Sequence, residues 1–178
     1  ALEAMEFAAK FHVGTRKDGV TPEFNHQVQI AHLLRTLEPS LLYPEETLAL
    51  VFLHDVPEDF AVGIEEIEAR FGQRVRLGVE AMTKKHRGKV KPTKEYYQGL
   101  AEDIIASIAK GGDRTHNLRT MVGVFVFDKQ VAYKEETVAH TIPMLKAARR
   151  NFPRQEAAYE NLKLILKSQV DLIQAIHQ

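Results

Sequence analysis

Residues 44–59 read PEETLALVFLHDVPED, and this stretch predicts both a type of structure and the place of a site. Pro44 followed by Glu45 and Glu46 is a favourable helix opening, because proline tolerates the first turn and carboxylates stabilise its dipole. The apolar residues 48–53 continue the helical spacing and run directly into His54 and Asp55. We therefore expect a helix that delivers a histidine and an aspartate at its end.

Helical spacing of apolar residues extends outward from this stretch in both directions. It predicts helices near residues 2–11, 26–34, 64–71, 75–82 and 96–108, and two long ones at about 129–149 and 154–176. Residues 85–92 are expected to form a loop, 122–127 an irregular link, and Gly111-Gly112 a break just before Asp113. The fold prediction is a compact, all-α multi-helix bundle. Residues 1–178 would form one domain, with the motifs in about 1–150 and a C-terminal helix at about 154–177.

Composition excludes several classes of function. Lys plus Arg and Asp plus Glu both number 24, so no overall field favours nucleic acid or an anionic membrane. The longest apolar run has six residues, too few to span a bilayer, and no signal-peptide pattern opens the sequence. With no cysteine, disulfides and thiolate ligands are excluded. We expect a cytoplasmic protein with a small-molecule substrate.

The chemistry indicated by His54-Asp55-Val56-Pro57-Glu58-Asp59 is metal binding. Adjacent imidazole and carboxylate donors suit Mn²⁺, Fe²⁺, Co²⁺ or Zn²⁺. Glu58 lies at helical spacing from both donors, where a carboxylate can take a proton from water made acidic by the cation. A His-Asp pair alone occurs by chance in many proteins. Two further segments strengthen the interpretation: residues 21–26, which place His26 at a helix start, and residues 110–120, which surround Asp113 with polar groups.

These three segments, in this order, resemble the HD-domain metal-dependent phosphohydrolases. The resemblance is closest to the guanosine tetraphosphate (alarmone) hydrolases, which comprise the hydrolase domains of RelA/SpoT proteins and the stand-alone small alarmone hydrolases. The matching motifs are residues 16–26, beginning with Arg16-Lys17, then residues 54–59 and residues 113–120. Phe71-Gly72, residues 82–84, Tyr133 and Glu136-Thr137 also match.

The resemblance implies a role for each matching residue. The metal, usually Mn²⁺, would be held by His26, His54, Asp55 and Asp113. Glu58 and Asp59 would activate the attacking water. Substrate contacts would come from Arg16 and Lys17 at the base, Asn117 at the ribose and phosphate, Tyr133 in the nucleotide pocket, and the basic residues Lys84, Lys85, His86 and Arg87 at the pyrophosphate. His116 is expected to support the site by packing or hydrogen bonding.

The reaction implied is removal of the 3′-pyrophosphate from guanosine tetra- or pentaphosphate, or from the adenosine analogue, giving a nucleoside di- or triphosphate and pyrophosphate. With no synthetase segment following, it would run one way. Two alternatives stay open: another HD nucleotide phosphohydrolase, acting on deoxynucleotides or the 2′-phosphate of NADPH, and a catalytically silent binding module in which Pro57 ends or kinks the helix and misplaces Glu58. The apolar faces of the last two helices could serve a homodimer or the core.

Overall fold

The computed structural model describes residues 1–86 and 88–178, and its secondary structure is dominated by helices, which confirms the all-α prediction. The first half contains α1 (Leu2–Ala9), α2 (Asn25–Arg35), η1 (Glu38–Ser40), α3 (Pro44–Leu53), α4 (Val56–Asp59), α5 (Ile64–Phe71) and α6 (Gln73–Met82). The hairpin strands β1 (Lys85–His86) and β2 (Lys89–Val90) follow. The second half contains α7 (Thr93–Glu102), α8 (Ala106–Met121), α9 (Phe127–Glu136), η2 (Thr137–Thr141), α10 (Ile142–Asn151), η3 (Pro153–Gln155) and α11 (Glu156–Ile176).

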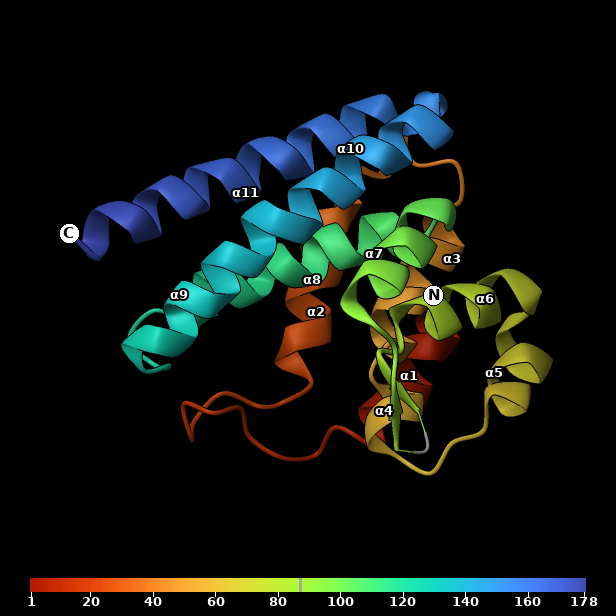
Figure 1. The fold of residues 1–178 in the computed structure, drawn as a ribbon. Coiled ribbons are helices and arrows are strands. Elements are labelled where there is room, and N and C mark those ends of the chain that lie inside the picture. Colours follow the sequence, from red (N-terminus) through yellow and green to blue (C-terminus); the bar gives the residue numbers. More distant parts are fainter. Residues whose placement is uncertain (87) are drawn as a thin grey trace.

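Helix α8 runs through the middle of the molecule (Figure 1). It contacts α2 and α3 on one side, α7 and α6 on another, and α10 and α11 on a third. Ile108 and Leu118 of this helix are almost completely buried. Because α8 also carries the Asp113 motif, the residues of that motif are held by the core and not by a surface loop.

The predicted break at Gly111-Gly112 is wrong, since both glycines lie inside α8. A Cβ at residue 111 would be 2.9 Å from Leu162 Cδ1, and a Cβ at residue 112 would be 2.9 Å from Ile30 Cγ2. Such distances are too short for unmoved neighbours, so the missing side chains let α11 and α2 approach α8 closely. Local composition suggested a breaker, whereas tertiary packing explains both residues.

Two other boundaries differ from the expected pattern. The helix expected over residues 96–108 is divided at Asp103, whose Oδ1 accepts hydrogen bonds from the amides of Ile105 (3.0 Å) and Ala106 (2.7 Å). That carboxylate satisfies amides at the start of α8, as capping side chains do. The loop expected over residues 85–92 contains a short antiparallel pairing, with Lys85 opposite Val90.

The C-terminal part agrees closely with the prediction. Residues 122–126 form the expected irregular link. The first long helix is α9 and α10, joined through the π-helical segment η2, and the second is α11. Among the described residues, no helix combines the length and the apolar character needed to cross a membrane.

Candidate metal centre and nucleotide pocket

Three predicted metal ligands lie together. His26 is near the start of α2, while His54 and Asp55 occupy the turn between α3 and α4. One potential ligand atom from each of these residues lies within 4.8 Å of the other two. Within residues 1–86 and 88–178, it is the one group of three or more histidine or acidic side chains whose ligand atoms lie close enough together to bind a single metal ion. Its mixed nitrogen and oxygen donors fit a divalent transition-metal ion.

Hydrogen bonds orient both imidazoles of this group. His54 Nδ1 donates to the Val51 carbonyl at 2.8 Å, which leaves its Nε2 with a free lone pair, 3.2 Å from Asp55 Oδ2. His26 Nδ1 lies 2.8 Å from His116 Nδ1. Burial and the neighbouring His26 lower the pKa of His116 to about 3, so the His116 ring is neutral and its Nδ1 can accept the hydrogen bond from His26 Nδ1. Both rings can therefore present Nε2 to a cation, and His116 supports the site as expected.

Asp113 adjoins this cluster through His26. Its Oδ1 is 3.3 Å from His26 Nε2 and accepts a 2.7 Å hydrogen bond from Asn117, while its Oδ2 is 2.8 Å from Lys110 Nζ. Burial opposes the charge of Asp113, but Lys110 and His26 outweigh it and hold its pKa well below the usual value. An ionised, buried carboxylate thus stands beside the compact group of three without being part of it.

The residues after Asp55 form the short helix α4. Pro57 lies in its first turn, where a missing amide proton breaks no helical bond. The main helix, α3, has already ended at Leu53, so Pro57 does not kink it. Glu58 Oε2 accepts hydrogen bonds from the amides of Lys84 (3.0 Å) and Lys85 (3.4 Å). Burial, followed by the charges of Asp55 and Glu58, raises the pKa of Asp59.

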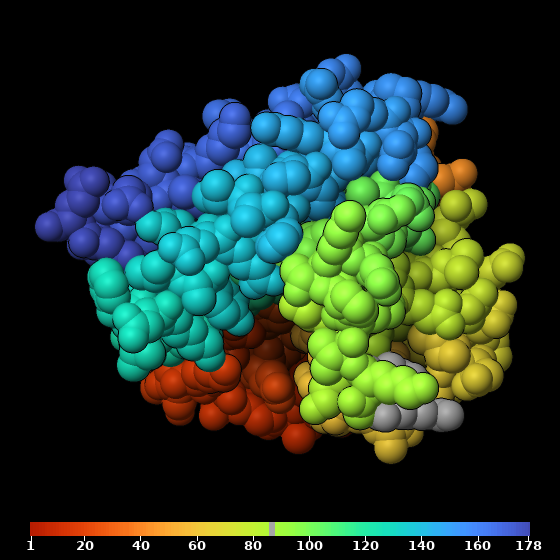
Figure 2. All heavy atoms as spheres, viewed as in Figure 1, coloured from red at the N-terminus to blue at the C-terminus, as the bar shows by residue number. Residues whose placement is uncertain are grey.

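A pocket of about 790 Å³ opens from the metal cluster, and Figure 2 shows the surface hollowed between the red N-terminal segment, the cyan α9 and the green segment that contains the hairpin. Its lining brings together most of the predicted site: Arg16, Lys17, His26, Asp55, Glu58, Asp59, Asp113, Asn117 and Tyr133. Carboxylates gather at the metal end. The loop that bears Arg16 and Lys17 is closed by Asp18, whose side chain accepts hydrogen bonds from the amides of Val20 and Thr21 and from the Thr21 hydroxyl.

The predicted pyrophosphate residues are placed differently. Neither Lys84 nor Lys85 is among the residues that line the pocket. Lys84 Nζ lies 3.8 Å from Glu136 Oε1, and it is the backbone of the two lysines that holds Glu58. Arg87 and the side chain of His86 lie outside the described part of the chain.

Two residues near the cluster were not anticipated. Lys110 precedes Asp113 by three residues, and side chains at this spacing on a helix are neighbours, so the Lys110–Asp113 ion pair could have been predicted from the sequence. Gln27 is almost fully buried, and its Nε2 lies 3.4 Å from both Asp55 Oδ2 and His12 Nε2. Nothing in the sequence around Gln27 distinguishes it from a surface glutamine.

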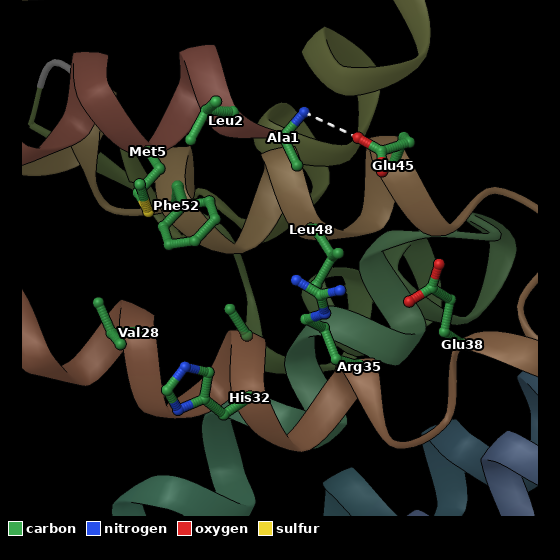
Figure 3. Close-up of a pocket in the computed structure, with 11 residues that line it drawn as sticks. Ala1, Leu2, Met5, Val28, His32, Arg35, Glu38, Glu45, Leu48 and Phe52 are labelled. Atoms are coloured by element: carbon green, nitrogen blue, oxygen red, sulfur yellow. Dashed lines mark hydrogen bonds and ion pairs between the residues drawn. The ribbon is translucent and has the colours of Figure 1, made fainter.

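A separate pocket of about 390 Å³ lies between α1, α2 and α3 (Figure 3). Met5, Val28, Leu48 and Phe52 give it a mainly apolar lining. Within the described residues, the compact metal-binding group is found at the first pocket and not at this one.

Comparison with known proteins agrees with this arrangement. Residues 4–151 match the family model described as HD domain. The chain belongs to the HD domain family. An HD domain binds a divalent metal, and in this one the His26, His54 and Asp55 group can hold it.

Relatives of this HD domain include much longer proteins. A probable guanosine-3′,5′-bis(diphosphate) 3′-pyrophosphohydrolase of Synechocystis is 36% identical over 123 residues, which is 65% of the chain and 16% of that protein. The bifunctional (p)ppGpp synthase/hydrolase SpoT of Escherichia coli is 31% identical over 150 residues, 80% of the chain and 21% of that protein. The chain thus spans about a fifth or less of the length of these two relatives.

A solved structure shares the fold. The protein in that structure is a metazoan ortholog of SpoT that hydrolyzes ppGpp and plays a role in starvation responses. It superposes with a TM-score of 0.70 and 23% identity, covering 96% of this chain and 93% of its own. At this identity the likeness establishes the fold alone.

Proposed function

We propose that this HD domain is a metal-dependent hydrolase that removes the 3′-pyrophosphate from guanosine tetra- or pentaphosphate, or from the adenosine analogue. The observation that carries the proposal is one pocket with a histidine–carboxylate cluster at one end and Arg16, Lys17, Asn117 and Tyr133 among its other lining residues. The names of the Synechocystis and Escherichia coli relatives point to the same reaction.

For the cation we propose Mn²⁺, held by His26, His54, Asp55 and Asp113. The first three supply the compact donor group, and Asp113 is ionised next to His26. When bound, such an ion supplies Lewis acidity to a phosphate oxygen and makes water more acidic. Fe²⁺, Co²⁺ and Zn²⁺ suit the same donors, so metal analysis of the purified protein tests this choice.

Asp59 and Glu58 are proposed to take the proton from the attacking water. One oxygen of Glu58 already accepts two amide hydrogen bonds, which fixes that carboxylate in place. Asp59 lines the same pocket, and burial followed by the charge of Asp55 raises its pKa, which makes it a stronger proton acceptor than an ordinary aspartate. We therefore favour Asp59 as the base and Glu58 as its neighbour that holds the water.

The nucleotide would occupy the remainder of the pocket. Arg16 presents a planar guanidinium on which a purine can stack, and Lys17 adds a positive charge. The Asn117 side-chain amide already donates one hydrogen bond to Asp113, and its second N–H is available to the ribose or phosphate. Tyr133 supplies an aromatic wall. For Lys84 and Lys85 the contact with pyrophosphate stays a prediction, because it requires their side chains to turn toward the pocket.

Product analysis by chromatography tests the proposal. Metal-stripped protein would receive guanosine and adenosine tetraphosphates, deoxynucleoside triphosphates and NADPH, each with and without Mn²⁺. We expect pyrophosphate only from the 3′-pyrophosphorylated nucleotides and only with metal. Phosphate or triphosphate from the other compounds would move the chain to another branch of the HD family. Absence of turnover with every compound and metal would indicate a silent binding module.

We also propose that residues 1–178 act as one unit, that they work in the cytoplasm, and that they form a homodimer. Packing of α11 against α8 supports the first statement. The exposed Leu164 and Leu172 of α11 support the last. Limited proteolysis, cell fractionation and analytical ultracentrifugation test these three statements in turn.

A further inference from the structure

An ion pair between a buried arginine and a partly buried glutamate lies behind the nucleotide pocket and has no part in the reaction proposed for the metal centre. Arg114 is next to Asp113 on α8, and its side chain is only 5% exposed. Its Nη2 is 2.9 Å from Glu136 Oε2, at the end of α9, and 3.2 Å from the Tyr97 hydroxyl. A guanidinium removed from water needs such a carboxylate, so the two side chains fix each other's position.

Glu136 is the point where several elements meet. Its Oε1 accepts a 2.9 Å hydrogen bond from the Tyr97 hydroxyl of α7 and lies 3.8 Å from Lys84 Nζ, beside the hairpin. The π-helical segment η2 begins at the next residue. Widened turns of this kind are frequent at functional sites. The Glu136 carboxylate, at the end of α9, thus contacts Tyr97 of α7, Arg114 of α8 and Lys84, which precedes the hairpin.

The Arg114 guanidinium also contacts Tyr133, which lines the nucleotide pocket. Arg114 Nη1 donates to the Tyr133 carbonyl at 3.4 Å, and Arg114 Cζ lies 5.0 Å from the centroid of the Tyr133 ring. Thr137 Oγ1 donates to the same carbonyl at 2.7 Å. Phe125 meets the ring edge to face, with 5.6 Å between centroids. Tyr133 is therefore held from its backbone and from its ring, while it lines the pocket.

From these contacts we infer that Arg114 and Glu136 are positioning residues, which set the Tyr133 wall of the nucleotide pocket. Neither residue lines the pocket, so they act through Tyr133, which does, and not by touching substrate. This inference rests on the proposed function. It assigns the pair to substrate binding and leaves the metal cluster independent of it.

The test compares Glu136→Gln with the matched control Glu160→Gln. Glu160 also forms a close pair with an arginine, 2.8 Å from Arg149 Nη1, but on α11 and away from the pocket lining. For Glu136→Gln with guanosine tetraphosphate we expect KM to rise about tenfold while kcat changes less than about twofold. Mn²⁺ affinity, measured by calorimetry, should be unchanged. Glu160→Gln should leave both kinetic constants at the wild-type values.

If Glu136→Gln does not fold, Tyr97→Phe carries the test, because it removes only the hydroxyl between Arg114 and Glu136. We expect Tyr97→Phe to raise KM about threefold. Unchanged KM, a fall in kcat alone, or weakened Mn²⁺ binding in an active protein overturns this inference while the proposed function stands. A wild-type protein with no turnover of 3′-pyrophosphorylated nucleotides overturns the proposed function and this inference with it.

Discussion

Replacing Gly112 by alanine tests whether the glycines of α8 serve close packing. The new Cβ would lie 2.9 Å from Ile30 Cγ2 and 3.2 Å from Leu34 Cδ2, both in buried residues of α2. Overpacking of this kind costs about 1–3 kcal/mol, and the higher helix propensity of alanine returns about 1 kcal/mol. The free energy of unfolding should therefore fall by up to about 2 kcal/mol.

Gly99 provides the control within the same protein. It is an exposed residue of α7, and a Cβ there meets nothing within 4 Å. Gly99→Ala should gain the same helix propensity with no clash, so its free energy of unfolding should rise by about 1 kcal/mol. The difference between the two variants isolates the overpacking cost, about 1–3 kcal/mol in favour of Gly99→Ala.

Urea unfolding followed by circular dichroism measures both free energies, and thermal unfolding gives a second estimate. For a chain of this size, each kcal/mol corresponds to about 2–4 °C in Tm. Gly99→Ala should unfold at a higher temperature than wild type, and Gly112→Ala at the same or a lower one. Equal stabilisation by the two substitutions would refute the packing explanation and would mean that α2 and α8 separate without cost.

Three predictions concern the metal end of the pocket. Asp55→Ala should abolish turnover and also Mn²⁺ binding, as measured by calorimetry. Mn²⁺-dependent activity in that variant would mean that Asp55 is not a metal ligand. Asp59→Asn should keep Mn²⁺ while kcat falls about 10²-fold or more, with a smaller loss in Glu58→Gln; the reverse order would make Glu58 the base. His116→Ala should weaken Mn²⁺ binding about 10- to 100-fold, because His26 Nδ1 loses its 2.8 Å partner. Unchanged affinity would mean that another group orients His26.

The sequence was most informative where chemistry constrains the residue type. A cation site requires particular donors, so His26, His54 and Asp55 could be selected from their types and order, and these three lie together. Helix positions also followed from apolar spacing, because each amphipathic face must be buried. Pro44, for example, does begin α3.

The errors came from contacts between distant parts of the chain. The breaker interpretation of Gly111 failed because the reason for that glycine is Leu162, on another helix. The contact of Lys84 with pyrophosphate stays a prediction, and the neighbour that its ammonium group has in the structure, Glu136, lies far along the sequence. Local composition reports neither partner. Conformations fixed by tertiary neighbours are the part that a single sequence leaves undetermined.

The two ends of the pocket are built on supports of different kinds. His26 and Asp113 come from α2 and α8, which pack against each other in the core, whereas Arg16 and Lys17 come from a loop that is held by Asp18 and by backbone hydrogen bonds such as that from the Arg16 amide to the Thr21 carbonyl. Substitutions in residues 15–22 therefore alter what the pocket accepts at little risk to the folded state, while changes at the cation end disturb the core. Such a division allows descendants of this domain to change their nucleotide while keeping their hydrolytic chemistry.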